Sequence, residues 1–165
     1  MITQCGTIVP QVQFCGPSDF TPRNAMPLQE SAEDSVALDY GQFFIHDVGT
    51  YFDVSEFPGD TWLETMDNCA LILGFTSGMY ATVKLELWTE PPDPVDPDDW
   101  NDDPIATQLL SEFGEICVSD ALFGTQAAHL LLGEADTVWN VLAHRRPTED
   151  PNYPEDYLFQ FWKNS

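Results

Sequence analysis

The chain has 165 residues, with 28 Asp and Glu against 5 Lys and Arg, and a formal net charge of −23. A surface this negative repels nucleic acid and anionic membranes, and it attracts cations and basic proteins. Apolar residues make up 43% of the chain and aromatic residues 13%, which excludes disorder throughout and favours a single folded domain over 1–165.

The N-terminal residues lack the features of a secretory signal. Residues 1–10 contain neither a basic segment nor an apolar one, and no later run approaches the ~18 apolar residues of a membrane-spanning helix. We therefore expect a cytoplasmic protein in which the four cysteines are reduced. Their spacing fits no zinc motif, and a bridge between Cys5 and Cys15 stays open as an alternative.

Alternation of apolar and polar residues predicts strands along most of the chain. Residues 1–37 read as a partly irregular N-terminal extension with a short strand near Ile8–Phe14. A strand is predicted at Tyr40–Val48. Residues Thr61–Asp67 are the one candidate for a turn or two of helix, because Thr61 suits an N-cap with Glu64 as its capping-box partner.

Two hairpins are predicted in the middle of the chain. The first joins the apolar run Cys69–Phe75 to a strand at 79–89 through a turn that contains Gly78. The second joins Ile105–Ser111 to Glu115–Ser119 through a turn that ends at Gly114. In the strand at 79–89 the residues expected to share one face are Met79, Ala81, Val83, Leu85 and Leu87.

Three further strands are predicted near the C-terminus, at Ala128–Leu132, Thr137–His144 and Tyr157–Trp162. Phe159 and its neighbours two residues away should face the core. Seven or eight short strands, with 13 prolines gathered in the connections, predict an all-β fold. We expect a single-domain antiparallel β-sandwich with acidic, Pro-rich loops.

The segment 90–103 is the candidate site for binding a partner. Its acids have the hard oxygens that Ca²⁺ takes, but the segment lacks the register of an EF-hand loop, so we predict no metal site. A solvated loop and a contact surface for a basic partner are the other interpretations. A tryptophan among carboxylates fits a binding hot spot, and it equally fits a side chain folded back onto the sandwich. The predicted contact residues are Asp93, Asp96, Asp98, Asp99, Trp100, Asp102 and Asp103.

No spacing in the chain indicates a catalytic centre or a cofactor site. His46, His129 and His144 are far apart in sequence, and none belongs to a recognised catalytic motif. Trp88 and Trp162 are predicted on outer faces, where exposed indoles would indicate a protein interface or sugar stacking.

Four segments together resemble the small β-rich bacterial proteins related to competence protein J, the inhibitor of a DNA-entry nuclease. They are Asp39–Asp47, the segment 69–89, the acidic loop leading to Phe113-Gly-Glu-Ile, and Pro154–Trp162. The resemblance spans about residues 38–162. It implies a β-sandwich and an inhibitor or immunity role against a nuclease, and it transfers no site residues.

The leading hypothesis is therefore a non-enzymatic acidic protein that binds and neutralises a basic protein, such as a nuclease or toxin, without a cofactor. Nucleic acid and membrane are not expected partners. The first alternative is a Ca²⁺- or carbohydrate-binding module that uses the acidic loop and the outer tryptophans. The second is a structural domain whose acidity serves solubility alone.

Overall fold

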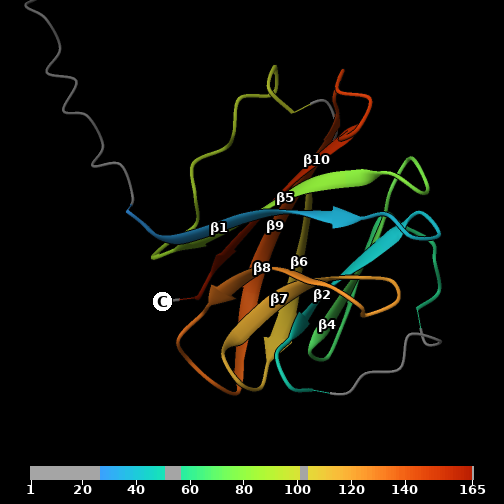
Figure 1. Ribbon diagram of the computed structural model, residues 1–165. Coiled ribbons are helices and arrows are strands. Elements are labelled where there is room, and N and C mark those ends of the chain that lie inside the picture. The colour runs from blue at the N-terminus through green and yellow to red at the C-terminus, as the bar shows by residue number, and fades with distance from the viewer. Residues whose placement is uncertain (1–26, 51–56, 101–103, 165) are drawn as a thin grey trace, which may run out of the picture.

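The structure is a computed structural model that describes residues 27–50, 57–100 and 104–164 (Figure 1). Every regular element in these ranges is a strand, and no helix there is long and apolar enough to span a membrane. The ten strands are β1 Leu28–Ala37, β2 Gln42–Asp47, β3 Leu63–Met66, β4 Cys69–Leu73, β5 Tyr80–Trp88, β6 Ile105–Ser111, β7 Glu115–Asp120, β8 Gln126–Leu131, β9 Thr137–Pro147 and β10 Glu155–Trp162. Ile8–Phe14, Cys5 and Cys15 lie outside the described residues.

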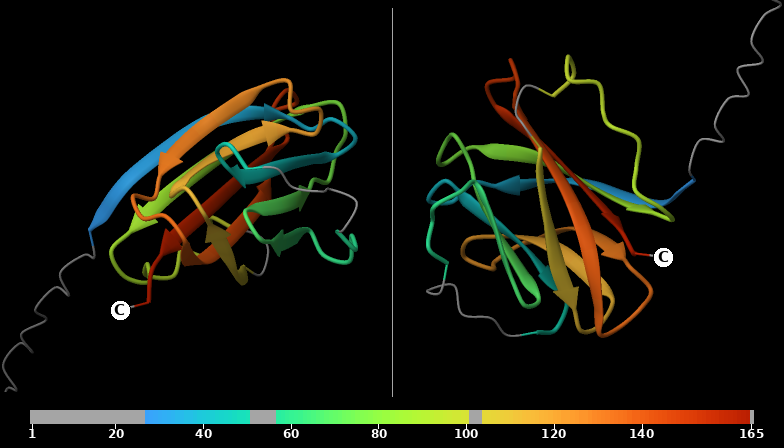
Figure 2. Two further views of the ribbon diagram at one scale, coloured as in Figure 1. Left: turned by 90° about the horizontal axis from the view of Figure 1, so that it is seen from below. Right: turned by 180° about the vertical axis from the view of Figure 1, so that it is seen from behind.

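The strands form two five-stranded sheets around a common interior (Figure 2). Sheet A has the order β1-β5-β10-β9-β6, and sheet B has the order β3-β4-β2-β7-β8. The all-β prediction is confirmed. Ten strands are present where seven or eight were expected, and β5 and β10 run parallel in the middle of an otherwise antiparallel sheet A.

Both predicted hairpins are wrong in their pairing, although their strands are present. β4 pairs with β2 and β3 in sheet B, whereas β5 pairs with β1 and β10 in sheet A. β6 and β7 likewise belong to different sheets. The two connections therefore cross from one layer to the other. A short connection that contains glycine can join two strands of one sheet or two strands of different sheets. The local sequence therefore does not distinguish a hairpin from a crossing between layers.

Two segments are strands where other structure was expected. Residues 28–37, assigned from sequence to the N-terminal extension, form β1 at the edge of sheet A. The segment Thr61–Asp67 contains β3 and no helix, because residues 63–66 pair with β4. The bond expected of a capping box is nevertheless made, since the Thr61 N–H donates to the Glu64 carboxylate over 3.1 Å.

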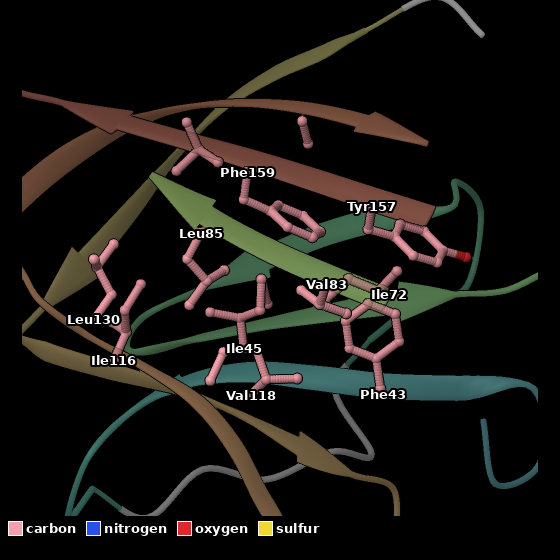
Figure 3. Close-up of a cluster of buried hydrophobic side chains, with 14 of the residues drawn as sticks. Phe43, Ile45, Ile72, Val83, Leu85, Ile116, Val118, Leu130, Tyr157 and Phe159 are labelled. Carbon is pink, nitrogen blue, oxygen red and sulfur yellow. The ribbon is translucent and has the colours of Figure 1, made fainter. Parts of the chain in front are cut away.

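The core lies between the sheets and is made by the inward residues of both (Figure 3). The predicted faces of β5 and β10 are confirmed, except that Met79 precedes β5 and is 40% exposed. Phe43 of sheet B meets Tyr157 of sheet A edge to face, with ring centroids 5.1 Å apart. The two sheets are thus joined by direct aromatic contact as well as aliphatic packing.

A buried carboxylate fastens the β4–β5 connection to sheet A. Glu155, the first residue of β10, is 1% exposed. Its side chain accepts hydrogen bonds from the backbone N–H and the hydroxyl of Thr76, both over 2.7 Å, and from the hydroxyl of Tyr157. A Cβ at Gly74 would lie 3.0 Å from this carboxylate, so the glycine permits the close approach.

We predict that Glu155→Ala lowers the free energy of unfolding by about 2–3 kcal/mol, because it removes the acceptor of the partly buried Thr76 donors and of the buried Tyr157 hydroxyl. Urea unfolding followed by fluorescence measures this change. Glu149→Ala, which removes an exposed carboxylate from the β9–β10 connection, is the matched control and should change stability by less than about 0.5 kcal/mol. Equal effects of the two substitutions would contradict the anchoring role of Glu155.

Candidate partner-binding surface

After β5 the chain folds back over the outer face of sheet A, as the yellow-green segment beyond β5 in Figure 1 shows. Within residues 89–100, every acidic side chain is exposed, including Asp93, Asp96, Asp98 and Asp99. The partly buried residues of this acidic loop are Pro92, Val95 and Trp100. The loop therefore has a packed apolar side and a carboxylate side that faces solvent.

Arg146 of β9 fastens the loop to the sheet. Its guanidinium carbon lies 4.7 Å from the centre of the Trp100 ring, and one of its nitrogens donates to the backbone carbonyl of Asp99 over 2.9 Å. Two other N–H groups donate to the carboxylate of Asp156 on β10. Trp100 also packs against His144, with ring centroids 5.7 Å apart. Of the two interpretations of Trp100, the structure shows the side chain folded back onto the sandwich.

The remaining predicted contact residues divide into two groups. Asp93, Asp96, Asp98 and Asp99 are brought together on the exposed side of the loop, where the backbone N–H of Asp98 donates to the side chain of Asp96. Asp102 and Asp103 lie outside the described residues. Within the described ranges, no three His, Cys, Asp or Glu side chains are grouped so as to hold a metal ion.

A polar cluster lies on the outer face of sheet A. Glu86 of β5 is 6% exposed and receives hydrogen bonds from Gln160 and Trp88, each over 3.0 Å. Lys84 lies 2.8 Å from the same carboxylate. Burial alone would raise the pKa of Glu86, but these three donors hold it below its ordinary value. Trp88 and Trp162 are both half-buried, and the indole N–H of Trp88 is engaged by Glu86.

A second surface, absent from the sequence analysis, lies where the β1–β2, β4–β5 and β9–β10 connections meet. Large apolar side chains are exposed on all three connections, and the chain's alternation pattern gave no sign of them because they stand outside the strands or at a strand's first residue. We call this group the aromatic end. Its members are Tyr40, Phe75, Met79, Tyr80 and Tyr153.

The histidines do not converge on one centre. His144 lies under the acidic loop on sheet A, whereas His46 and His129 lie on sheet B, on either side of Cys117. The Nε2 atom of His46 is 2.7 Å from the hydroxyl of Ser119, a contact that residues 73 positions apart do not reveal in sequence. Ser119 is 1% exposed, and burial lowers the pKa of His46. This pair is therefore enclosed in the outer layer of sheet B, where Phe44 and Phe123 contact each other.

We predict that Trp100→Ala raises the pKa of His144 toward its ordinary value of 6.5. Burial is the main cause of the lowered pKa of this ring, opposed by the neighbouring Gln160 and Glu86, and Trp100 supplies part of that burial. Titration of the imidazole by NMR measures the shift. Phe113→Ala, which truncates an exposed ring elsewhere, should leave the pKa unchanged.

The same shift has a consequence for stability. Because the pKa of His144 is lower in the folded protein, the unfolded chain takes up the proton first as the pH falls below 6.5. The stability contributed by the neutral ring is present above that pH and is lost as the pH falls through the folded pKa. Urea unfolding between pH 7.5 and 5.5 should show this loss, and His144→Gln should reduce it. An unchanged slope in the variant would contradict the assignment.

No family model matches the chain, and no curated protein matches it. Two solved structures do. Competence protein J from Bacillus subtilis, described as ComJ, inhibitor of the DNA degrading activity of NucA, matches with a TM-score of 0.62 and 10% identity over 84% of this chain and 98% of its own. A protein described as crocagin biosynthetic gene J matches with a TM-score of 0.54 and 10% identity over 82% and 98%. The resemblance to competence protein J is thus confirmed in the fold.

Proposed function

We propose that this chain is a non-enzymatic, inhibitor-like protein that binds and neutralises a basic protein, a nuclease or a toxin, through its acidic loop. The observation that carries the proposal is the two-sided construction of the loop. Its apolar residues and Arg146 hold it on sheet A, and this leaves Asp93, Asp96, Asp98 and Asp99 directed to solvent.

Electrostatics favours a nuclease as the target. A nuclease presents a positive groove to the phosphates of its substrate, and carboxylates held on a fixed loop can occupy phosphate positions in that groove. A net charge of −23 would also steer a basic partner toward the loop and raise the association rate. The same charge disfavours nucleic acid and anionic membrane as partners, and we place the encounter in the cytoplasm.

The structural comparison supports the inhibitor class. The fold matches 98% of the length of a protein described as an inhibitor of a DNA-degrading activity, so the whole of that inhibitor's architecture has a counterpart here. At 10% identity the comparison supplies no contact residues. The contact residues of the proposal therefore rest on the geometry of the acidic loop.

The experiment is an affinity capture from host lysate with the tagged chain, at low and at physiological salt, followed by a DNA-degradation assay on the captured protein. The expected result is a basic nuclease, or a basic toxin, that stays bound at physiological salt and loses activity when the chain is added. Capture of many unrelated cationic proteins that dissociate together with salt would overturn the proposal.

We predict that the double substitution Asp98→Lys and Asp99→Lys weakens binding to the captured partner tenfold or more, mostly by slowing association. Both side chains are exposed, and the contact that Arg146 makes is to the backbone carbonyl of Asp99, so the fold should persist. The matched control makes the same charge change at exposed acids on other connections, Asp67→Lys with Glu112→Lys. Surface plasmon resonance measures both, and equal losses would contradict a specific role of the loop.

A further inference from the structure

The aromatic end brings five exposed large apolar side chains to one end of the molecule. The exposed fractions are 79% for Tyr40, 51% for Phe75 and 52% for Tyr80, with Met79 and Tyr153 at about two-fifths. Contiguous exposed rings of this kind mark contact surfaces on soluble proteins. Tyr80 and Tyr153 are themselves neighbours, with ring centroids 6.1 Å apart.

The three connections that carry these rings are held in fixed positions. The N–H of Gly78 donates to the carbonyl of Leu38, and the N–H of Gly74 donates to the carbonyl of Gly41, which joins the β1–β2 and β4–β5 connections. The N–H of Tyr80 is 3.4 Å from the carbonyl of Asn152, which brings in the β9–β10 connection. The buried carboxylate of Glu155 adds its bonds to Thr76. The rings are therefore presented on a surface that is ordered before any partner arrives.

Tyr40 is presented at a conformational cost. Its φ is 57°, in the left-handed region where a bulky side chain is uncommon. The N–H of Gln42 donates to the carbonyl of Asp39 across this turn, and Gly41 also has a positive φ of 72°, so the two-residue turn requires the left-handed region at both of its central residues. The turn therefore accounts for the backbone conformation of Tyr40, and it leaves the ring, which is 79% exposed, open to an external contact.

The molecule's own arginines show which group such rings accept. The guanidinium carbon of Arg145 lies 4.0 Å from the centre of the Phe75 ring and 4.9 Å from that of Trp62. Carboxylates stand beside the exposed tyrosines in the chain, with Asp39 next to Tyr40 and Asp150 close to Tyr153. Exposed aromatic faces on a strongly acidic molecule suit a planar cation that can stack on them, which is the guanidinium rather than the ammonium group.

We propose that the aromatic end binds arginine side chains on the surface of the basic partner. The inference rests on the proposed function and deepens it: the acidic loop attracts any cation, whereas the aromatic end distinguishes arginine from lysine. A second copy of this chain is disfavoured as the occupant, because two bodies of charge −23 repel each other.

Octa-arginine and octa-lysine peptides of equal charge are the probes, titrated into the full chain by calorimetry at physiological salt. Octa-arginine should bind about fivefold more tightly than octa-lysine. The double variant Tyr80→Ala and Tyr153→Ala should remove most of this preference, and Tyr80→Phe with Tyr153→Phe should keep it. Phe113→Ala, which truncates a ring that is 61% exposed on the β6–β7 connection, is the control and should leave the preference unchanged.

The outcomes separate this inference from the proposed function. Equal affinities for the two peptides, or a preference that survives loss of the tyrosines, overturns the inference. If the Asp98→Lys and Asp99→Lys variant then still weakens both peptides and the captured partner, the acidic-loop proposal stands alone. A concentration-dependent dimer that the tyrosine variants abolish would assign the aromatic end to a second copy and would also overturn the inference.

Discussion

The outer face of sheet A must be shielded from water, and this constraint determines where the acidic loop lies. The central strands β5 and β10 run parallel, and strands in that arrangement are stable when both of their faces are buried. The side chains on their outer face include Leu158, Glu86 and Gln160, all buried. In the part of the chain that the structure describes, no helix is available for this purpose, and Trp100 of the acidic loop packs there against His144 and Arg146. The carboxylates of the same loop are left exposed to solvent.

The acids of this chain fall into two kinds with different consequences. A few are buried and accept hydrogen bonds that fix a connection: Asp47 binds the N–H of Phe113, Asp120 binds those of Leu122 and Gly124, and Glu155 binds that of Thr76. Each satisfies donors that burial would otherwise leave unpaired. The acids of the loop accept few such bonds and stay in water. Net charge alone therefore does not separate the two kinds of acid; burial and hydrogen bonding do.

Much of the fold could be predicted from sequence because alternation is a local property. The strand at 79–89 and the inward face of Phe159 follow from it directly. The pairing of β4 and β5 could not be predicted, since it depends on which layer each strand joins. For the site, the carboxylates of the loop could be foreseen. The sequence left two interpretations of Trp100 open and did not indicate the aromatic end, because both depend on contacts between distant residues such as that of Arg146 with Asp99, 47 positions apart.

The chain's one basic pair links the two surfaces. Arg145 and Arg146 are consecutive in β9, so their side chains point to opposite faces of sheet A. Arg145 stacks on Phe75 at the aromatic end, and Arg146 stacks on Trp100 under the acidic loop. Both arginines thus fix aromatic rings, and Arg146 also pairs with the carboxylate of Asp156. The two arginines therefore position rings on opposite faces of sheet A, whereas the carboxylates of the acidic loop stay exposed.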